Sequence, residues 1–566
     1  MLPSGKTFFR LLIPLALCTR PAMAEHDSVF RRDVLPGLER PALLSIEVTR
    51  PRPGYIMDMA RLDGRSYILI QGESGAADAI LVVGPTGEPE SRFEIGREFA
   101  SGLAATPEGL WVLSRNSRSF LRLLSRSGQV LRTIRATGNA PGRLYGLVAA
   151  DNRFFFSRIQ DDRSTVFELF PQSGASREIS SLPGKIRVLG FADGEVLAVR
   201  EHDGVYSADW LDFIDPETGA VRTMRFFSAT VRGLAVENDQ TFALRLLEDS
   251  IRIFPFYIDV PEKRVVGEPA ARRVSVVYRF RNENSNPYEL YTWLPVPANE
   301  RFQVVRNVQI HPEPTEYAND RFGNRWARFD WQNDPVAQVR IDFEVLSYSV
   351  AYTIPEVRLT PDLFRGLESF TRPTYSFDFE HQTVAAEIAR LRRENELGQQ
   401  IVTLHDHVNN RLRVVGGSGP ESKASEFLSQ GVGRCYAHTL AFAALGRGIG
   451  IPGRAIGGLR IDRGQMRQGE VGEHTWNQIY VPGPGWVDVD TQLDDDPEGD
   501  HRRSYIGYRN NSRWVTFVGE YDQRDDRTVF TERSWYRTYR WRSTTGPRAR
   551  VRAEGPEITS SDLRHW

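Results

Sequence analysis

One cysteine, one histidine and one aspartate in the second half of the chain have the types needed for nucleophilic catalysis. Cys435 follows Gly-Val-Gly-Arg at 431–434 and precedes a run of small residues at 439–446, so we expect it in the first turn of a helix. The partial positive charge of a helix N-terminus favours the thiolate, the form of cysteine that attacks a carbonyl carbon. His474 could hold the thiol proton and Asp490 could orient the imidazole, which together would form a thioester-forming triad.

Whether His474 and Asp490 can meet depends on the register of the two strands that carry them. A four-residue turn between the strands would place the two side chains on opposite faces of the sheet. A five-residue loop at 481–485 would pair Tyr480 with Trp486 and put both groups on one face. Asp490 would then lie diagonal to His474, with about 7–8 Å between the backbone positions. The Pro-Gly-Pro-Gly composition of the loop is compatible with this length but does not select it.

The elements around these residues indicate an α+β domain at residues 380–543. Apolar residues at helical spacing predict helices between 384 and 412, and a further helix is expected over about 433–448. Strands are expected at 475–481 and 486–490. Helices followed by sheet strands in this order are typical of α+β domains.

Four motifs in order resemble the core of the transglutaminase-like superfamily. They are Gly-Arg-Cys-Tyr at 433–436, Gly-Ile-Gly-Ile-Pro-Gly-Arg at 448–454, His-Thr-Trp-Asn at 474–477 and the stretch 485–491. The resemblance covers about residues 380–495. It implies a papain-like fold with a triad formed by Cys435, His474 and Asp490. Members include protein cross-linking acyltransferases, peptidases, other amide hydrolases and proteins that have lost activity.

The sequence departs from the family pattern at three positions next to the triad. Asn477 and Gln478 stand where an acidic residue is common after the tryptophan, and Thr491 stands where proline is common. None of these positions carries the mechanism. The family spacing of four residues from Trp486 selects Asp490 over Asp488 as the third member.

Other groups near the triad are expected to support catalysis without forming part of the triad. His438, one turn after Cys435, is expected to be a packing or supporting residue, with a role as an alternative base left open. Arg454 is expected to brace its loop by pairing. The backbone N–H of Cys435 is expected to serve as one oxyanion donor, together with a second group that the sequence does not identify.

The sequence predicts no metal or organic cofactor. His405 and His407 lie two apart on an expected helix and so point in different directions. The acidic residues between 494 and 500 could bind calcium, although a solvated loop is the simpler interpretation.

The N-terminal half is expected to form a β-propeller-like domain over residues 40–265. Similar hairpins recur around turn glycines at a spacing that matches one four-stranded blade, and about five blades would fit; these glycines are Gly87, Gly128, Gly174 and Gly219. An irregular β-sandwich with evenly spaced turns is the alternative. This domain contains no catalytic cluster, so its expected role is scaffolding or binding of a protein partner.

Between these two domains, residues 266–375 are expected to form a β-sandwich. Apolar residues alternate at 274–280 and 339–345, and prolines interrupt the path between them. The motifs Leu-Pro-Val-Pro at 294–297 and Arg-Phe-Gly-Asn at 321–324 resemble the β domain that precedes the catalytic core in some bacterial relatives. The last stretch, 544–566, is expected to be a loosely ordered tail.

The N-terminus has the pattern of a bacterial-type secretory signal peptide, residues 1–24. Lys6 and Arg10 precede an apolar run that ends in Ala-Met-Ala at 22–24. Cleavage there would remove Cys18, leave Cys435 as the single thiol, and export the protein to the periplasm or the medium. Beyond the leader no apolar run is long enough to span a membrane. The net charge of −1 provides no basic field for nucleic acid.

The sequence therefore predicts an exported, multidomain cysteine enzyme that acts on the amide bonds of a protein or peptide. Hydrolysis is slightly favoured over transfer to an amine, by analogy with processing enzymes, since the triad itself does not distinguish them. The alternative from another class is a propeller-based binding or assembly protein that keeps a residual catalytic fold.

Overall fold

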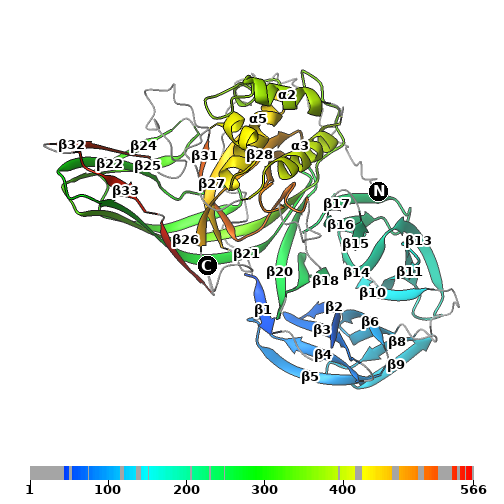
Figure 1. Ribbon diagram of the computed structural model, residues 1–566. Coiled ribbons are helices and arrows are strands. Elements are labelled where there is room, and N and C mark those ends of the chain that lie inside the picture. The colour runs from blue at the N-terminus through cyan, green and yellow to red at the C-terminus, as the bar shows by residue number, and fades with distance from the viewer. Residues whose placement is uncertain are drawn as a thin grey trace, which may run out of the picture.

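The computed structural model describes Leu38 and residues 44–566 apart from 50–53, 74–75, 98, 115–119, 136–141, 151, 204–206, 228–230, 248, 321, 393–395, 415–422, 462–470, 495–502, 520–537, 545–547, 555 and 564–565. The expected leader, residues 1–24, lies outside the described residues. The N-terminal region is made of strands in many small sheets, and helices cluster around a further sheet in the C-terminal part (Figure 1).

The N-terminal sheets, residues 46–259, are antiparallel and follow one another along the chain. Four of them have four strands each in sequence order. These are β2 (Tyr55–Leu62), β3 (Arg65–Gln71), β4 (Asp78–Val83) and β5 (Pro89–Gly96); β6 (Ala100–Thr106), β7 (Gly109–Ser114), β8 (Phe120–Leu124) and β9 (Val130–Arg135); β10 (Arg143–Ala150), β11 (Arg153–Gln160), β12 (Arg163–Leu169) and β13 (Ser176–Pro183); and β14 (Lys185–Ala192), β15 (Glu195–Asp203), β16 (Ser207–Ile214) and β17 (Val221–Arg225). The fifth group contains β18 (Val231–Glu237), β19 (Gln240–Leu246) and β20 (Ser250–Asp259), and β1 (Ile46–Thr49) pairs with β20.

The same irregularity recurs in all five groups of the N-terminal sheets. The register between the first and second strand shifts by one residue at positions 57, 101, 146, 187 and 232. The first strands also contact one another in succession, β2 with β6, β6 with β10, β10 with β14 and β14 with β18, and β18 returns to β2. The five-bladed propeller stays a prediction.

Two sheets of the middle region pack face to face. In the first, β21 (Arg264–Asn282) pairs with β26 (Val336–Tyr352), which pairs with β23 (Gln303–His311). In the second, the order is β24 (Glu316–Asn319), β25 (Arg325–Gln332), β22 (Tyr288–Pro295) and β32 (Thr538–Ser543). The alternating apolar residues of 274–280 and 339–345 are buried in one cluster with Leu290 and Phe329 of the second sheet. This burial is the reason for the alternation in the sequence.

The C-terminal stretch differs from the expected loose tail. Within 544–566, β33 (Val551–Ala553) and β34 (Glu557–Asp562) both pair with β21. Val551 and Ile558 are buried in the cluster between the two middle sheets, and this burial holds the short strands in place. The preceding strand, β32, pairs with β22 and so belongs to the middle region, in contrast to the expected domain boundary at residue 543.

The C-terminal part combines helices with a four-stranded antiparallel sheet. The helices are α2 (Gln382–Leu391), α3 (Leu397–Arg411), α4 (Ala424–Gln430) and α5 (Cys435–Ile449), preceded by the short 3-10 helix η1 (Glu368–Phe370). The sheet has the order β29 (Gly485–Val489), β28 (Val471–Val481), β27 (Gly453–Ile461) and β31 (Arg513–Gly519). The short strand β30 (Tyr508–Arg509) pairs with β26 of the middle region. Helix α5 packs on β27 and β28, and α2, α3 and α4 all contact α5.

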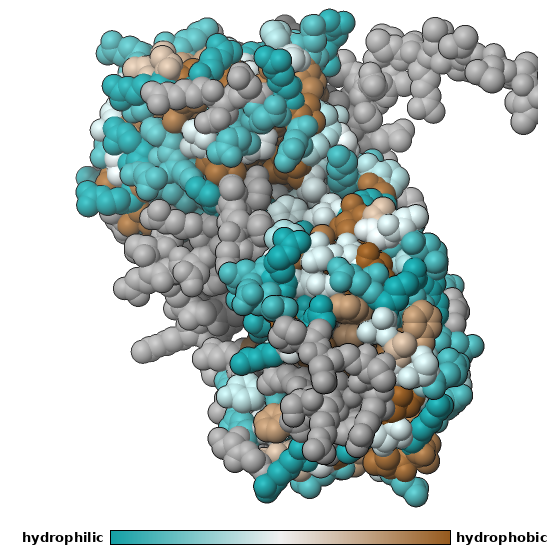
Figure 2. All heavy atoms as spheres, turned by 90° about the vertical axis from the view of Figure 1, so that its right-hand side faces the viewer, coloured by the Kyte–Doolittle hydropathy of each residue, from teal (hydrophilic) through white to brown (hydrophobic). Residues whose placement is uncertain are grey.

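The described surface is predominantly hydrophilic on the face drawn in Figure 2, where hydrophobic residues occur as small separate patches. Apolar side chains gather instead in clusters inside the sheets and around α5. Among the helices of the described residues, none is both long and apolar enough to cross a membrane.

Candidate active site

Helix α5 places Cys435 at its first residue. Arg434 caps the helix with an extended backbone, and Gly433 is needed before it because a Cβ there would lie 2.1 Å from the Cβ of Ala437. The small and apolar residues that follow are buried against β27 and β28. Cys435 as a whole residue is half-buried. The helix start and its cysteine therefore lie where the sequence predicted them.

The hairpin of β28 and β29 has the register that the triad requires. Tyr480 pairs with Trp486, and Val481 also pairs with Gly485, which shortens the turn to 482–484. His474 lies near the beginning of β28, and Asp490 follows the last residue of β29. The side chains of His474 and Asp490 consequently lie on the same face of the sheet.

The structure brings all three predicted residues together. Nε2 of His474 and Oδ2 of Asp490 are 2.7 Å apart, and both side chains are almost completely buried. A side-chain hydrogen bond joins Cys435 to His474. Since Nε2 faces Asp490, the remaining ring nitrogen, Nδ1, is the one available to the thiol. The ring of Trp476 stacks on the imidazole with 5.9 Å between centroids and helps to fix its plane.

Electrostatics around the cysteine favour a thiolate–imidazolium pair. Burial opposes the charged thiol, but the hydrogen bond and charge of His474 outweigh it and lower the pKa of Cys435 to about 7. Burial likewise opposes the imidazolium, but Asp490 and the thiol raise the pKa of His474 to about 9. Between these two values the ion pair is the dominant form, and a nucleophile is present at neutral pH.

Asp488 has a different set of partners from Asp490. Its Oδ1 accepts hydrogen bonds from Nε1 of Trp476 at 2.6 Å and from Nε2 of Gln478 at 3.3 Å. Arg454 donates to Oε1 of Gln478 and lies over the ring of Trp486, so it braces the β28–β29 hairpin through a neutral partner. Asp488 and Arg454 thus hold the hairpin, and Asp490 alone of the two aspartates bonds to His474.

Arg513 is a member of the site that sequence reasoning missed. Its Nη1 lies 2.8 Å from Oδ2 of Asp490, and its Nη2 donates to the carbonyl of Tyr508. Both side chains of the Arg513–Asp490 pair are buried. Burial alone would raise the pKa of Asp490, but the charges of His474 and Arg513 lower it below its usual range. Arg513 begins β31, far from any motif, so only its place in the sheet reveals it.

Two threonines connect the helix to the strand beside the thiol. Oγ1 of Thr439 donates to the carbonyl of Cys435 at 2.8 Å and lies 3.2 Å from Oγ1 of Thr475. Thr475 in turn hydrogen-bonds to Cys435 and contributes to lowering its pKa. These hydroxyl groups fix the helix start relative to β28.

His438 is buried on α5, and no described residue is a hydrogen-bond partner for either of its ring nitrogens. Burial lowers the pKa of His438 to about 4, so this ring is neutral at physiological pH. The thiol hydrogen-bonds to His474, and neither ring nitrogen of His438 hydrogen-bonds to it.

The two histidines of α3 bind different partners. Nε2 of His405 lies 3.0 Å from Oδ2 of Asp494, whereas His407 lies 3.4 Å from Glu387. Asp494, the first residue of the acidic run, is therefore a partner of a histidine, and residues 495–500 lie outside the described part. Within the described part of the chain, no group of three or more His, Cys, Asp or Glu side chains is arranged to hold a metal ion.

Residues 382–491 match the family model of the transglutaminase-like superfamily core. A curated protein of Haemophilus influenzae, itself uncharacterized, is 26% identical over a match that covers 35% of this chain and 62% of the relative. The match thus spans less than two thirds of that relative.

Among solved structures, a candidate cysteine protease from Cytophaga hutchinsonii aligns with 53% of this chain and 93% of its own, with 13% identity and a TM-score of 0.40. The nidogen/laminin complex aligns with 38% of this chain and 75% of its own, with 11% identity and a TM-score of 0.27. The match to the family model and the placement of its motifs identify residues 382–491 as a transglutaminase-like domain.

Proposed function

We propose that the protein is a cysteine enzyme that acts on peptide or amide bonds through a thioester. The observation that carries this proposal is the thiol of the half-buried residue Cys435, hydrogen-bonded to an imidazole that is itself held by a buried carboxylate 2.7 Å away. A thiol with a pKa of about 7 in this setting is an activated nucleophile.

In the first half of the reaction, Sγ of Cys435 attacks the carbonyl carbon of the substrate. The amide C–N bond breaks, His474 gives its proton to the departing amine, and the acyl group remains on sulfur as a thioester. The N–H of Cys435, in the first turn of α5, has no partner inside the helix and can stabilise the oxyanion.

In the second half, His474 removes a proton from the acceptor, which attacks the thioester carbon. The C–S bond breaks and the thiolate is restored. Water as the acceptor gives hydrolysis, which we favour, and an amine gives transglutamination. No step of either route uses a metal or an organic cofactor.

The test is a mass-spectrometric comparison of a peptide and amine library treated with the native protein or with Cys435→Ala. We expect cleaved peptides that appear only with the native protein. Amine adducts would select the acyltransferase route instead. Identical product patterns for the two proteins would contradict the proposal.

A second candidate role rests on the N-terminal sheets. The recurrence of one bulge in five groups and the succession of contacts from β2 round to β18 and back support a five-bladed propeller. Such a domain would bind a protein partner or present a substrate to the catalytic domain. If binding were the only function, Cys435 would react slowly with an alkylating reagent at both neutral and mildly acidic pH.

Export is the third part of the proposal and rests on the leader pattern of residues 1–24. Cleavage after Ala24 would leave Glu25 as the first residue. N-terminal sequencing of the protein recovered from outside the cytoplasm tests this, and an intact Met1 in that fraction would contradict it.

A further inference from the structure

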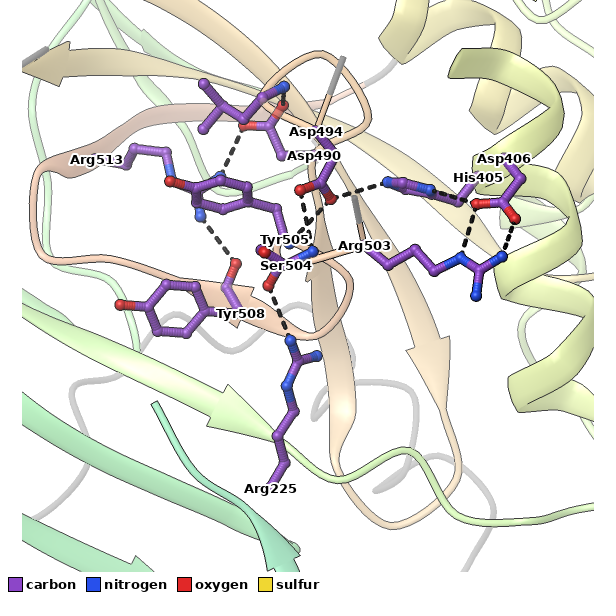
Figure 3. A network of polar contacts seen from close by, with 11 residues as sticks. Arg225, His405, Asp406, Asp490, Asp494, Arg503, Ser504, Tyr505, Tyr508 and Arg513 are labelled. Atoms are coloured by element: carbon purple, nitrogen blue, oxygen red, sulfur yellow. Dashed lines mark hydrogen bonds and ion pairs between the residues drawn. The ribbon is translucent and has the colours of Figure 1, made fainter. Parts of the chain in front are cut away.

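A second buried histidine–aspartate pair lies beside the triad, and the mechanism above does not use it. His405 of α3 and Asp494 are both fully buried, and their side chains are 3.0 Å apart. Nδ1 of the same imidazole faces Asp406, which also forms an ion pair with Arg503 (Figure 3). The acidic partners of His405 outweigh burial and raise its pKa.

Asp494 holds the segment that follows it, residues 503–509, which we call the bracing segment. Oδ1 of Asp494 accepts the N–H of Ser504, and Oδ2 accepts the N–H of Tyr505, each at 3.0 Å. Oδ2 also faces Nε2 of His405. One carboxylate thus fixes the start of the bracing segment to α3, as the dashed lines in Figure 3 show.

The bracing segment in turn contacts the backbone of the triad aspartate. The N–H of Asp490 donates to the carbonyl of Tyr505 at 3.3 Å, and the N–H of Gly507 donates to the carbonyl of Asp488 at 2.8 Å. On its other side, Gly507 accepts from the N–H of Tyr352 in β26. The segment therefore lies between β29 and β26 and is hydrogen-bonded to the backbone at the end of β29.

The bracing segment also contacts Arg513, the residue that bonds to the carboxylate of Asp490. Arg513 bonds to both Asp490 and the carbonyl of Tyr508, and its guanidinium lies 5.0 Å from the ring centre of Tyr505. Displacement of the segment would therefore disturb Asp490 through its backbone and through its cation.

The N-terminal sheets hold the segment from a third direction. Nη2 of Arg225, the last residue of β17, donates to the carbonyl of Ser504 at 2.8 Å. The ring of Tyr508 is buried among apolar residues of β14–β20 such as Phe226. The bracing segment thus connects a distant part of the chain to Asp490.

We propose that Asp494, held by His405, is a positioning residue for the triad. Asp494 fixes the bracing segment, and the segment in turn holds Asp490 against His474. Arg225 anchors the segment to the N-terminal sheets. This inference rests on the proposed function, because it concerns how that triad is kept active. Asp494 acts through Asp490 and does not touch the reacting atoms.

The test measures the rate of Cys435 alkylation by iodoacetamide from pH 5 to pH 10 in the full-length protein. This readout needs no substrate and depends on the thiolate fraction. For Asp494→Asn and His405→Gln we expect the midpoint to rise by about one pH unit, which makes alkylation about tenfold slower at pH 6 and leaves the rate at pH 10 unchanged. Arg225→Lys should shift the midpoint in the same direction.

Matched controls lie on the same elements. His407→Gln lies on α3 outside the network, and Arg222→Lys lies on β17 with its charge paired to Glu195. Both should keep the wild-type profile. Circular dichroism establishes that each variant is folded, and if Asp494→Asn does not fold, His405→Gln and Arg225→Lys carry the test.

Wild-type profiles for Asp494→Asn, His405→Gln and Arg225→Lys would overturn the positioning role and leave the triad intact. Shifts of equal size in the two control variants would also overturn it, because they would reflect general loosening. A wild-type protein whose thiol titrates near pH 8.5 would instead contradict the proposed function, and the inference would fall with it.

Discussion

At the scale of single residues, the carboxylate of Asp490 serves two cations at once. Its Oδ2 lies 2.7 Å from His474 and 2.8 Å from Arg513 in a buried setting. Arg513 keeps the carboxylate charged, because it stabilises the ionised form whether or not His474 is protonated. The charged carboxylate then stabilises the imidazolium, which in turn stabilises the thiolate of Cys435.

This arrangement predicts a bell-shaped pH dependence for acyl transfer. The lowered pKa of Cys435, about 7, means that activity rises through that pH as the thiolate forms. The raised pKa of His474, about 9, means that activity falls above it as the imidazolium loses the proton needed by the leaving amine. Alkylation needs only the thiolate and should rise through pH 7 without falling at 9. Parallel rate measurements check this, and a fall in both curves would contradict the assignment.

The two aspartates of β29 and its end should respond differently to the same substitution. Asp490→Asn keeps the shape but removes the charge that supports His474, and should lower the acyl-transfer rate by up to about 10⁴-fold. Asp488→Asn retains an acceptor for Nε1 of Trp476, so its acyl-transfer rate should match that of the wild type. Acyl-transfer rates of the two variants measured in parallel test this prediction. Equal losses of rate would show that Asp488 also supports catalysis.

At the scale of elements, the β28–β29 hairpin and the start of α5 could be predicted from the sequence. The periodicity of a strand is two, so a register that pairs Tyr480 with Trp486 puts His474 and Asp490 on one face, and that register is present. Glycines before Cys435 and small residues after it indicated a helix start, and Gly433 leaves no room for a Cβ there.

The contacts that support the triad could not be predicted from the sequence, because the residues that form them are distant along the chain. Arg513 lies 23 residues from Asp490, and His405 lies 89 residues from Asp494, with no motif at either position. The strands at the C-terminus were missed for a related reason. Each strand is short and has few buried residues, and its pairing with the long strand β21 is what stabilises it.

The close packing of β27 against its neighbours predicts a sensitive glycine. A Cβ on Gly458 would lie 2.1 Å from the carbonyl oxygen of Trp514 and 2.6 Å from the ring of Trp476. Gly458→Ala should therefore destabilise the domain by about 1–3 kcal/mol and slow alkylation of Cys435, since Trp476 stacks on His474. Thermal unfolding and alkylation rates measure the two effects.

Gly472 on the adjacent strand β28 provides the control for this prediction. A Cβ there meets no atom within 4 Å, so Gly472→Ala should change stability by less than about 0.5 kcal/mol. Equal destabilisation by the two substitutions would show that strand propensity, and not the packing at Gly458, is responsible.

At the scale of the whole molecule, one buried carboxylate links three of the N-terminal sheets. Asp58 of β2 accepts the N–H groups of Met59, of Leu103 in β6 and of Leu147 in β10. Asp58→Ala would leave these buried donors unpaired, at a cost of about 1–3 kcal/mol each, and should lower the unfolding temperature. Calorimetry measures this against Asp162→Ala, an exposed position that should have no effect. An unchanged transition for Asp58→Ala would mean that other acceptors take over.

The pairing of β1 with β20 has a consequence for biosynthesis. Glu47 and Ser250, which bond across this pair, are 203 residues apart, so β1, the first strand among the described residues, has no strand partner until β20 has been made. Strand β21 must wait still longer for β34 near the opposite terminus. A nascent chain interrupted anywhere between would carry exposed strand edges, which invite aggregation and recruit chaperones.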